Sequence, residues 1–194
     1  MKKALLFLLI IVSSHCMAQD SLQMLNFKRN QIKNGGMQVL GSWAAANIVV
    51  GGIGWATTKG QTKYFYQMNT LWNVANLGVA FLGYNSTIRD KNRTYTAQES
   101  LEEQRKIENI FLVNGALDLG YIGAGIYLRH RGITNSSNQS KGYGSAVIMQ
   151  GAFLLLFDAT MYTSERKAGN KLRRFLIKNP MTFDGHKIGT IINF

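Results

Sequence analysis

The sequence predicts an all-α membrane protein, a polytopic four-helix bundle made of two helical hairpins. Three observations favour this fold class. Apolar residues gather into four blocks with almost no charge, each block has the length of a membrane-spanning helix, and glycines and amide side chains recur inside the blocks. A composition of 46% hydrophobic and 16% charged residues excludes a disordered chain, and a single cysteine excludes a disulfide scaffold.

Residues 1–18 have the pattern of a cleaved secretory signal peptide. Two lysines precede an apolar run, and small residues mark a cleavage site after Ala18. A lipoprotein signal is the alternative, because such signals end at a cysteine, but His15 is not the small residue expected before Cys16. Cleavage removes the chain's one cysteine and leaves residues 19–36 as a polar N-terminal tail.

A four-helix transmembrane domain is predicted over residues 37–162. We expect its spans at about 37–56, 67–84, 110–128 and 145–162. The first two contain no Asp, Glu, Lys or Arg, and each of the other two contains one carboxylate. Helices on the surface of soluble proteins carry charged stripes, which the first two blocks lack. A soluble periplasmic helical bundle is the alternative.

Polar side chains on these spans are the candidate site residues. Three asparagines of the second span are spaced i, i+4 and i+7 and share one helix face, and we expect Asp118 of the third span to meet that face. An intramembrane carboxylate costs roughly 2.5 to 3.5 kcal/mol on insertion scales, so such acids face a bundle interior and mark ion or proton pathways or polar ligands. Interhelical hydrogen bonding is the alternative role. The full candidate set is Asn69, Asn73, Asn76, Asn114, Asp118, Gln150 and Asp158.

Residues 163–194 are predicted to form a basic amphipathic tail. Apolar residues spaced i, i+3 and i+4, from Leu172 to Leu176, stand among basic residues, which is typical of a short helix on a membrane surface. A small β-hairpin with its turn at Phe183-Asp184-Gly185-His186 is expected to follow. No nucleic-acid-binding signature is present. We expect anionic lipid headgroups to bind Lys171, Arg173, Arg174 and Lys178.

Two rules give opposite orientations for the spans. A cleaved signal leaves the new N-terminus outside the cytoplasm. By that rule 15 Lys and Arg residues lie on the external side and five lie in the short turns, whereas basic residues normally favour the cytoplasmic side. We expect the signal to dominate insertion and the bacterial inner membrane to be the location.

Motifs for catalysis, cofactors or metals are missing from the sequence. There is no P-loop, G-x-S-x-G elbow or H-E-x-x-H motif. His130 and His186 lack partners at metal-ligand spacing. No catalytic residue, cofactor or metal is therefore predicted.

Three runs resemble a domain-of-unknown-function family of small bacterial membrane proteins. The runs are Met68–Asn73, Asn114–Gly123 and Gln150–Asp158, and the likeness extends from about Gly35 to Tyr162. The resemblance implies a four-helix membrane architecture and no established activity.

These patterns favour a non-enzymatic membrane protein. It would bind or pass a small polar species or a proton through an Asn- and Asp-lined interior, or serve as a structural partner in the membrane. A second copy of the chain or another membrane protein is the expected protein partner. The alternative is an intramembrane or interfacial enzyme acting on lipid, with Asp118 and Asp158 as acid and base.

Overall fold

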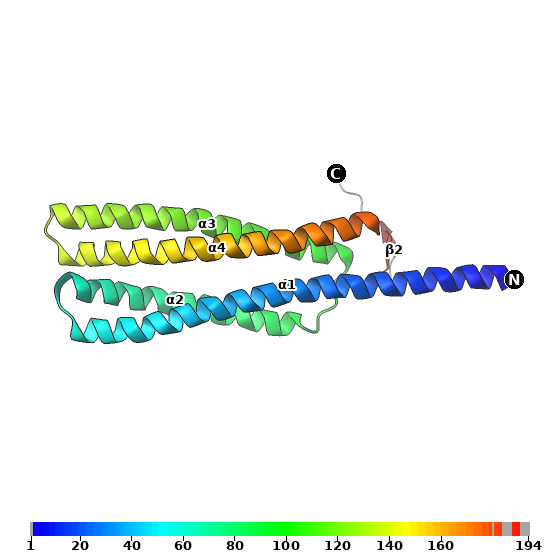
Figure 1. The fold of residues 1–194 in the computed structure, drawn as a ribbon, viewed down its shortest axis with the longest axis horizontal. Coiled ribbons are helices and arrows are strands. Elements are labelled where there is room, and N and C mark those ends of the chain that lie inside the picture. The colour runs from blue at the N-terminus through cyan, green and yellow to red at the C-terminus, as the bar shows by residue number, and fades with distance from the viewer. Residues whose placement is uncertain (1, 180, 184–187, 191–194) are drawn as a thin grey trace.

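The computed structural model consists of four long helices arranged as two antiparallel pairs. It describes residues 2–179, 181–183 and 188–190, with side chains described for 20–179. α1 pairs with α2 and α3 with α4, and the two pairs meet mainly through α2 and α4 (Figure 1). The predicted all-α, four-helix fold is confirmed. The helices are α1 (Lys2–Thr57), α2 (Gly60–Asp90), α3 (Ala97–Thr134) and α4 (Asn138–Lys178).

The turns that join each pair lie at one end of the bundle (Figure 1). Between α1 and α2, Gly60 has a φ of +61°, a left-handed conformation that glycine adopts without steric cost. Between α3 and α4, Ser137 caps α4 by accepting a hydrogen bond from the backbone N–H of Ser140. At the opposite end, Thr96 and Glu99 form a capping box that begins α3.

The helices are longer than a bilayer is thick. α1 has 56 residues and α4 has 41, which correspond to about 84 Å and about 62 Å at a rise of about 1.5 Å per residue. The hydrocarbon core of a bilayer is about 30 Å thick. We therefore distinguish an apolar half, residues 37–84 and 110–162, from a terminal half, residues 20–36, 85–109 and 163–178.

Three helices, α1, α3 and α4, are long and apolar enough to cross a membrane. α2 has 31 residues but does not meet the same hydropathy criterion over its described length. The asparagines that lower its hydropathy are buried in the bundle. A span at 67–84 therefore stays a prediction.

The terminal part of α4 differs from the predicted separate amphipathic helix. α4 continues unbroken to Lys178, so residues 163–178 extend the fourth helix. Leu172 and Leu176 are buried in one cluster with Leu22 of α1 and Ala97 of α3. The apolar face expected to lie on a membrane surface therefore packs inside the protein.

The N-terminal segment also joins a longer element. α1 begins at Lys2 and includes the predicted signal peptide and the polar tail 19–36 in one continuous helix. Cleavage after Ala18 stays a prediction.

Two short strands follow α4. β1 (Met181–Phe183) and β2 (Ile188–Thr190) pair antiparallel, with Thr182 opposite Gly189. The predicted turn residues Asp184–His186 lie outside the described residues.

Candidate functional site

The apolar half has an apolar exterior and a polar interior. Only 17% of the apolar stretch of α3 is buried. Soluble monomers rarely expose contiguous apolar patches larger than a few hundred Å², whereas helices in lipid expose them along their whole length. The large apolar side chains of this half that are more than half exposed include Val49, Val50, Ile53, Leu71, Val74, Val79, Phe81, Leu82, Leu112, Val113, Leu117, Leu119, Ile126, Tyr127 and Leu156.

Inside the apolar half, side chains from three helices form one connected amide cluster. Gln150 of α4 donates to Asn69 Oδ1 of α2 and accepts from the indole Nε1 of Trp43 on α1 at 3.2 Å. Asn69 in turn donates to Asn47 Oδ1 at 2.9 Å. Because these buried groups bond to one another, the amide cluster joins α1, α2 and α4. Trp43 and Asn47 are members that the sequence analysis missed.

The polar face of α2 continues beyond the amide cluster. Asn73 Nδ2 donates to the backbone carbonyl of Asn69 at 2.8 Å, and Asn76 Nδ2 lies 3.4 Å from Asn73 Oδ1. The three asparagines of α2 are therefore on one buried face, with Asn76 nearest to the carboxylates of α3 and α4 that share its cavity.

Asp118 of α3 and Asp158 of α4 form a buried carboxyl pair. The two side chains lie within hydrogen-bonding reach of each other and are 3% and 5% exposed. A hydrogen bond between two carboxyl groups requires a proton on one of them. Asp118 Oδ2 has no hydrogen-bond partner among the described residues. The pair can therefore hold a proton and accept a hydrogen bond from a ligand.

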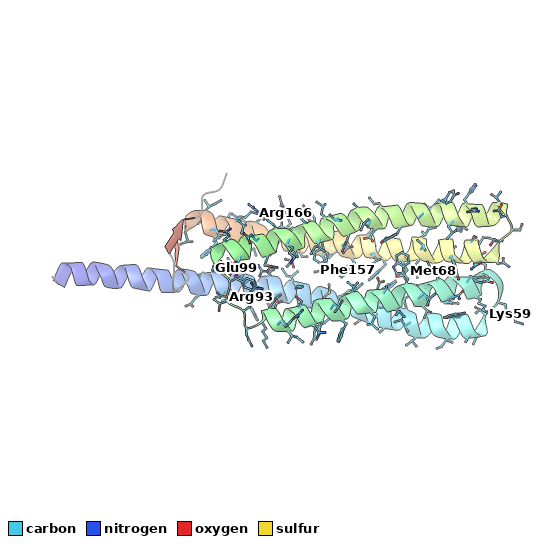
Figure 2. The ribbon with its side chains drawn as sticks, turned by 180° about the vertical axis from the view of Figure 1, so that it is seen from behind. Lys59, Met68, Arg93, Glu99, Phe157 and Arg166 are labelled. Carbon is cyan, nitrogen blue, oxygen red and sulfur yellow. The ribbon has the colours of Figure 1, made fainter. Side chains whose placement is uncertain are left out.

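A cavity of about 520 Å³ lies beside the carboxyl pair, and we call it the carboxyl cavity. Asn76 and Asn114 line it together with the pair, so Asp118 faces the asparagine face of α2 across a cavity instead of packing against it. Phe157 points between the two helix pairs (Figure 2).

The mouth of the carboxyl cavity lies between α2 and α3. The backbones of these two helices stay apart over their described length, although the rings of Trp72 and Tyr121 meet edge to face with their centroids 5.0 Å apart. Val79 and Leu82 of α2 and Leu117 of α3 line the cavity and are more than half exposed. The cavity thus opens through the apolar exterior of the bundle.

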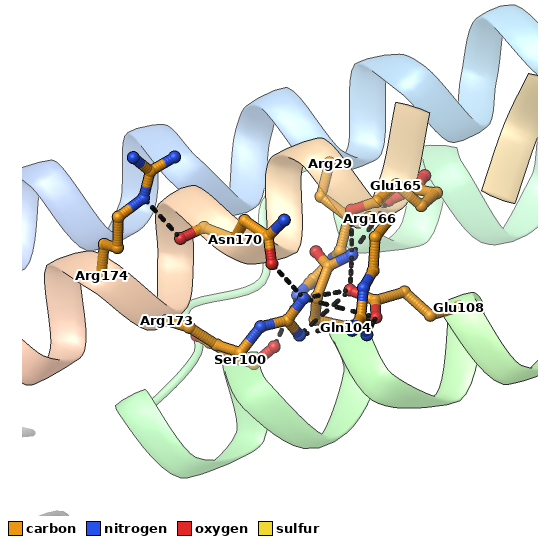
Figure 3. A network of polar contacts seen from close by, with 9 residues as sticks. All are labelled: Arg29, Ser100, Gln104, Glu108, Glu165, Arg166, Asn170, Arg173 and Arg174. Atoms are coloured by element: carbon orange, nitrogen blue, oxygen red, sulfur yellow. Dashed lines mark hydrogen bonds and ion pairs between the residues drawn. The ribbon is translucent and has the colours of Figure 1, made fainter. Parts of the chain in front are cut away.

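The terminal half buries charged side chains that the sequence analysis missed. Glu108 of α3 is 3% exposed and accepts hydrogen bonds from Arg166 Nη1 at 2.9 Å and Arg173 Nη1 at 3.1 Å (Figure 3). Gln104 Nε2 donates to the backbone carbonyl of Glu165 at 2.9 Å. Glu165 follows Asp158 by seven residues, a spacing that places both on one helix face. This spacing could have indicated from the sequence that Glu165 also faces the bundle interior.

Burial raises the pKa of Glu165 from 4.5 to about 7. The hydrogen bond from Gln104 and the charges of Arg29 and Lys33 oppose this rise, whereas the charge of Glu108 adds to it. Glu165 Oε1 has no hydrogen-bond partner among the described side chains. Near neutral pH this carboxyl therefore changes its protonation state.

The four predicted headgroup residues all lie in the terminal half. Arg173 is engaged by Glu108, and Arg174, Lys171 and Lys178 are exposed. A headgroup role for these residues stays a prediction.

No group of three His, Cys, Asp or Glu side chains within the described part of the chain is placed to hold a metal ion. The carboxyl pair and the amide cluster are thus the chemistry-bearing groups of the apolar half.

Comparison with known proteins gives a family and no activity. No curated protein and no solved structure matches the chain. A family described as a family of unknown function (DUF6992) matches residues 39–159, a segment that contains all seven predicted polar residues. Since this match covers more than half of the chain, the protein belongs to the DUF6992 family.

Proposed function

We propose that the protein is an integral membrane protein that binds a small molecule carrying an ammonium or other hydrogen-bond-donating group. The ligand would contact Asp118 and Asp158 in the carboxyl cavity. The observation that carries this proposal is a buried carboxyl pair, with one unpartnered oxygen, on the wall of a cavity of about 520 Å³.

The exposed apolar surface supports membrane placement. In lipid, helices associate through close packing and interhelical polar contacts, and their outward faces need no polar groups. The amide cluster of Asn69, Gln150, Trp43 and Asn47 matches the interior expected of such a bundle. A soluble periplasmic bundle would expose the same apolar side chains to water, which makes it the weaker alternative.

The bonding of each polar group separates structural residues from ligand-binding residues. Asn69 and Gln150 already bond to one another and to α1, so they have little capacity left for a ligand. Asp118 retains an unpartnered carboxyl oxygen. A buried acceptor without a hydrogen-bond partner destabilises the folded protein, because it has lost its bonds to water. A ligand that donates a hydrogen bond to this acceptor removes that destabilisation.

The walls of the carboxyl cavity indicate the rest of the ligand. Trp72, Phe111 and Tyr121 contribute aromatic surface, and aromatic faces attract cations. The mouth lies among lipid-facing side chains of α2 and α3, so a ligand would enter from the bilayer. A short apolar chain ending in an ammonium group fits these features.

Hexylammonium and hexanoate, two ions of equal chain length and opposite charge, provide the test. We expect hexylammonium to raise the thermal unfolding midpoint of the detergent-solubilised protein and hexanoate to leave it unchanged. The doubly substituted variant Asp118→Asn, Asp158→Asn should fold but lose the response, because the amides keep the shape and remove the acidic groups. Glu102→Gln, at an exposed carboxylate of α3 outside the cavity, should respond as the parent does.

Equal responses to both ions, or an unchanged response in the doubly substituted variant, would contradict ligand binding at the carboxyl pair. Extraction of the protein from membranes by alkaline carbonate would separately contradict its membrane placement.

An enzyme that acts on lipid, with Asp118 and Asp158 as acid and base, is the second candidate. The closeness of the two carboxyl groups favours it, because adjacent carboxyls can share one proton and divide the two roles. Consumption of a lipid by the purified protein, lost in either Asp→Asn variant, would support it over simple binding.

A further inference from the structure

A second cavity, of about 480 Å³, lies in the terminal half, and we call it the basic cavity. Its walls come from the part of α1 that precedes the first predicted span, from the connection between α2 and α3, and from the first turns of α3. It shares Lys33 and Ile107 with the carboxyl cavity, so the two cavities adjoin at these residues.

The basic cavity contains a buried arginine. Arg29 is 5% exposed, donates to the backbone carbonyl of Ser100 at 3.1 Å and lies over the ring of Tyr95 at 4.8 Å. Among the described residues no carboxylate forms an ion pair with Arg29. The charge of Arg29 interacts with Glu165, whose pKa it lowers, but no described carboxylate reaches it at ion-pair distance, so this guanidinium can bind an anion in the cavity.

Further basic side chains line the same space. Arg93 lies over the Tyr95 ring at 4.7 Å, and Lys33 and Lys91 complete the basic set. Three acidic side chains also line the cavity, and two of the bases already have partners, Lys33 with Asp90 at 3.4 Å and Arg93 with Glu99 at 3.3 Å, so a phosphate would share or replace these partly exposed pairs. Guanidinium and ammonium groups converging on a cavity are the usual partners of phosphate.

Two unpartnered acceptors lie beside these bases. Asn26 Oδ1 and Asn30 Oδ1 are buried, line the cavity and have no hydrogen-bond partner among the described residues. Their amide nitrogens are engaged elsewhere, by Ser100 Oγ at 2.8 Å and the Thr87 carbonyl at 2.8 Å respectively. The cavity therefore offers donors for an anion and, next to them, acceptors for a hydroxyl or ammonium group.

One end of the basic cavity lies at the depth expected of a lipid headgroup. Lys33 precedes the first predicted span at 37 by four residues, and Ile107 precedes the third at 110 by three, which are rises of about 4.5 to 6 Å, whereas Arg29 precedes the first span by eight residues, a rise of about 12 Å. Each headgroup layer of a bilayer is roughly 5 to 8 Å thick. Met24 and Phe27, exposed apolar side chains of α1, line the same cavity and suit an amphipathic occupant.

We propose that the basic cavity binds a phospholipid headgroup that carries a phosphate and a hydrogen-bond donor. Arg29, Lys33 and Arg93 contact the phosphate, and Asn26 and Asn30 accept from the hydroxyl or ammonium group. This site rests on the membrane placement of the proposed function, but not on any ligand at the carboxyl pair.

Short-chain lipids added to the protein in a non-ionic detergent test this site. We expect dihexanoyl phosphatidylglycerol or phosphatidylethanolamine to bind and raise the thermal unfolding midpoint. Dihexanoyl phosphatidylcholine should bind at least several-fold more weakly, because its quaternary ammonium has no N–H to donate to the asparagines. Glycerol 3-phosphate and inorganic phosphate should bind more weakly still, because they lack acyl chains.

Substitutions at exposed residues keep the test independent of folding. The doubly substituted variant Lys91→Gln, Arg93→Gln should weaken phosphatidylglycerol binding about tenfold or more, because it removes two cationic groups. Lys167→Gln, at an exposed lysine of α4 that does not line the cavity and is outside the predicted headgroup set, should bind as the parent does.

Three results would overturn the site. The first is equal phosphatidylglycerol binding by these two variants. The second is equal binding of phosphatidylcholine and phosphatidylglycerol by the parent protein. The third is binding of inorganic phosphate as tight as that of the lipid. Failure of the hexylammonium test alone would contradict ligand binding at the carboxyl pair but not the headgroup site. Release of the protein from membranes by alkaline carbonate would contradict both the proposed function and the headgroup site.

Discussion

The two halves of the bundle bury polar side chains in different ways. The apolar half has amides and a carboxyl pair inside and apolar side chains outside. The terminal half has charged side chains paired inside, notably Glu108 with Arg166 and Arg173, next to an apolar cluster that includes Leu172 and Leu176.

The proposed placement of the apolar half in a membrane and of the terminal half in water accounts for this difference. In lipid the outward faces of helices gain nothing from charge, and uncharged amides hold the helices together at small cost. In water the apolar side chains move inside, and charged groups are retained only where a partner neutralises them. Under the proposed membrane placement, one helix such as α4 changes its pattern of burial at the point where it would leave the membrane.

The largest expected effect comes from Glu108, whose removal would leave Arg166 and Arg173 without their shared carboxylate. We expect Glu108→Ala to destabilise the protein by about 3 to 5 kcal/mol, because it removes two hydrogen bonds between charged groups, each contributing roughly 1.5 to 3 kcal/mol, and the half-exposed Arg166 recovers part of its loss from water. Thermal or denaturant unfolding of the detergent-solubilised protein measures the change. Glu102→Ala, at an exposed site of α3, should cost less than about 0.5 kcal/mol. A cost below about 1 kcal/mol for Glu108→Ala would mean that the terminal half does not depend on this pairing.

A pH-dependent effect is expected at Glu165. Burial raises the pKa of Glu165 to about 7, against 4.5 in the unfolded chain. Between these pH values the folded state holds a proton that the unfolded state has released, so stability falls as the pH rises from about 4.5 to about 7. Glu165→Gln should remove this dependence and be more stable than the parent at pH 8 by on the order of 3 kcal/mol. Parallel pH profiles for the two proteins would contradict this account of Glu165.

A smaller effect is expected in the apolar half. Asn69→Leu removes the hydrogen bonds to Asn47 and Gln150, and interhelical bonds in membranes contribute roughly 0.6 kcal/mol each on average. We expect a loss of about 1 to 2 kcal/mol, measured by the same unfolding assay. Leu71→Asn, at an exposed position of α2, should weaken membrane insertion instead of bundle packing. A loss at Asn69 as large as that at Glu108 would remove the difference between the halves.

The apolar half was largely predictable from the sequence, because helical spacing shows which polar residues share a face. The asparagine face of α2 and the inward position of Asp118 and Asp158 follow from that spacing. The hydrogen-bond partners of these residues could not be predicted from spacing, because the partners depend on how each helix is rotated about its axis relative to its neighbour. Asp118 therefore lies next to Asp158. A cavity lies between Asp118 and the α2 asparagines, and helical spacing in the sequence does not reveal that cavity.

The terminal half was not predictable in the same way. An amphipathic pattern such as residues 163–178 shows that one face is apolar, but not whether lipid or protein covers it. Glu108 and Glu165 look like ordinary surface charges in a polar stretch of sequence. Glu108 is buried by the packing of α3 against α4, and Glu165 also faces the charges of Arg29 and Lys33 on α1, so their surroundings depend on helices far apart in the chain.

The central claim is that a carboxyl pair inside the bundle is reached from the bilayer. Dicyclohexylcarbodiimide, which partitions into membranes and reacts with protonated carboxyl groups, tests this claim when it is added to the protein in lipid vesicles. Mass spectrometry of the peptides should find the label on Asp118 or Asp158, no label there in the Asp118→Asn, Asp158→Asn variant, and little label with a water-soluble carbodiimide. The absence of label at both residues in vesicles, or equal labelling by the water-soluble reagent, would contradict it.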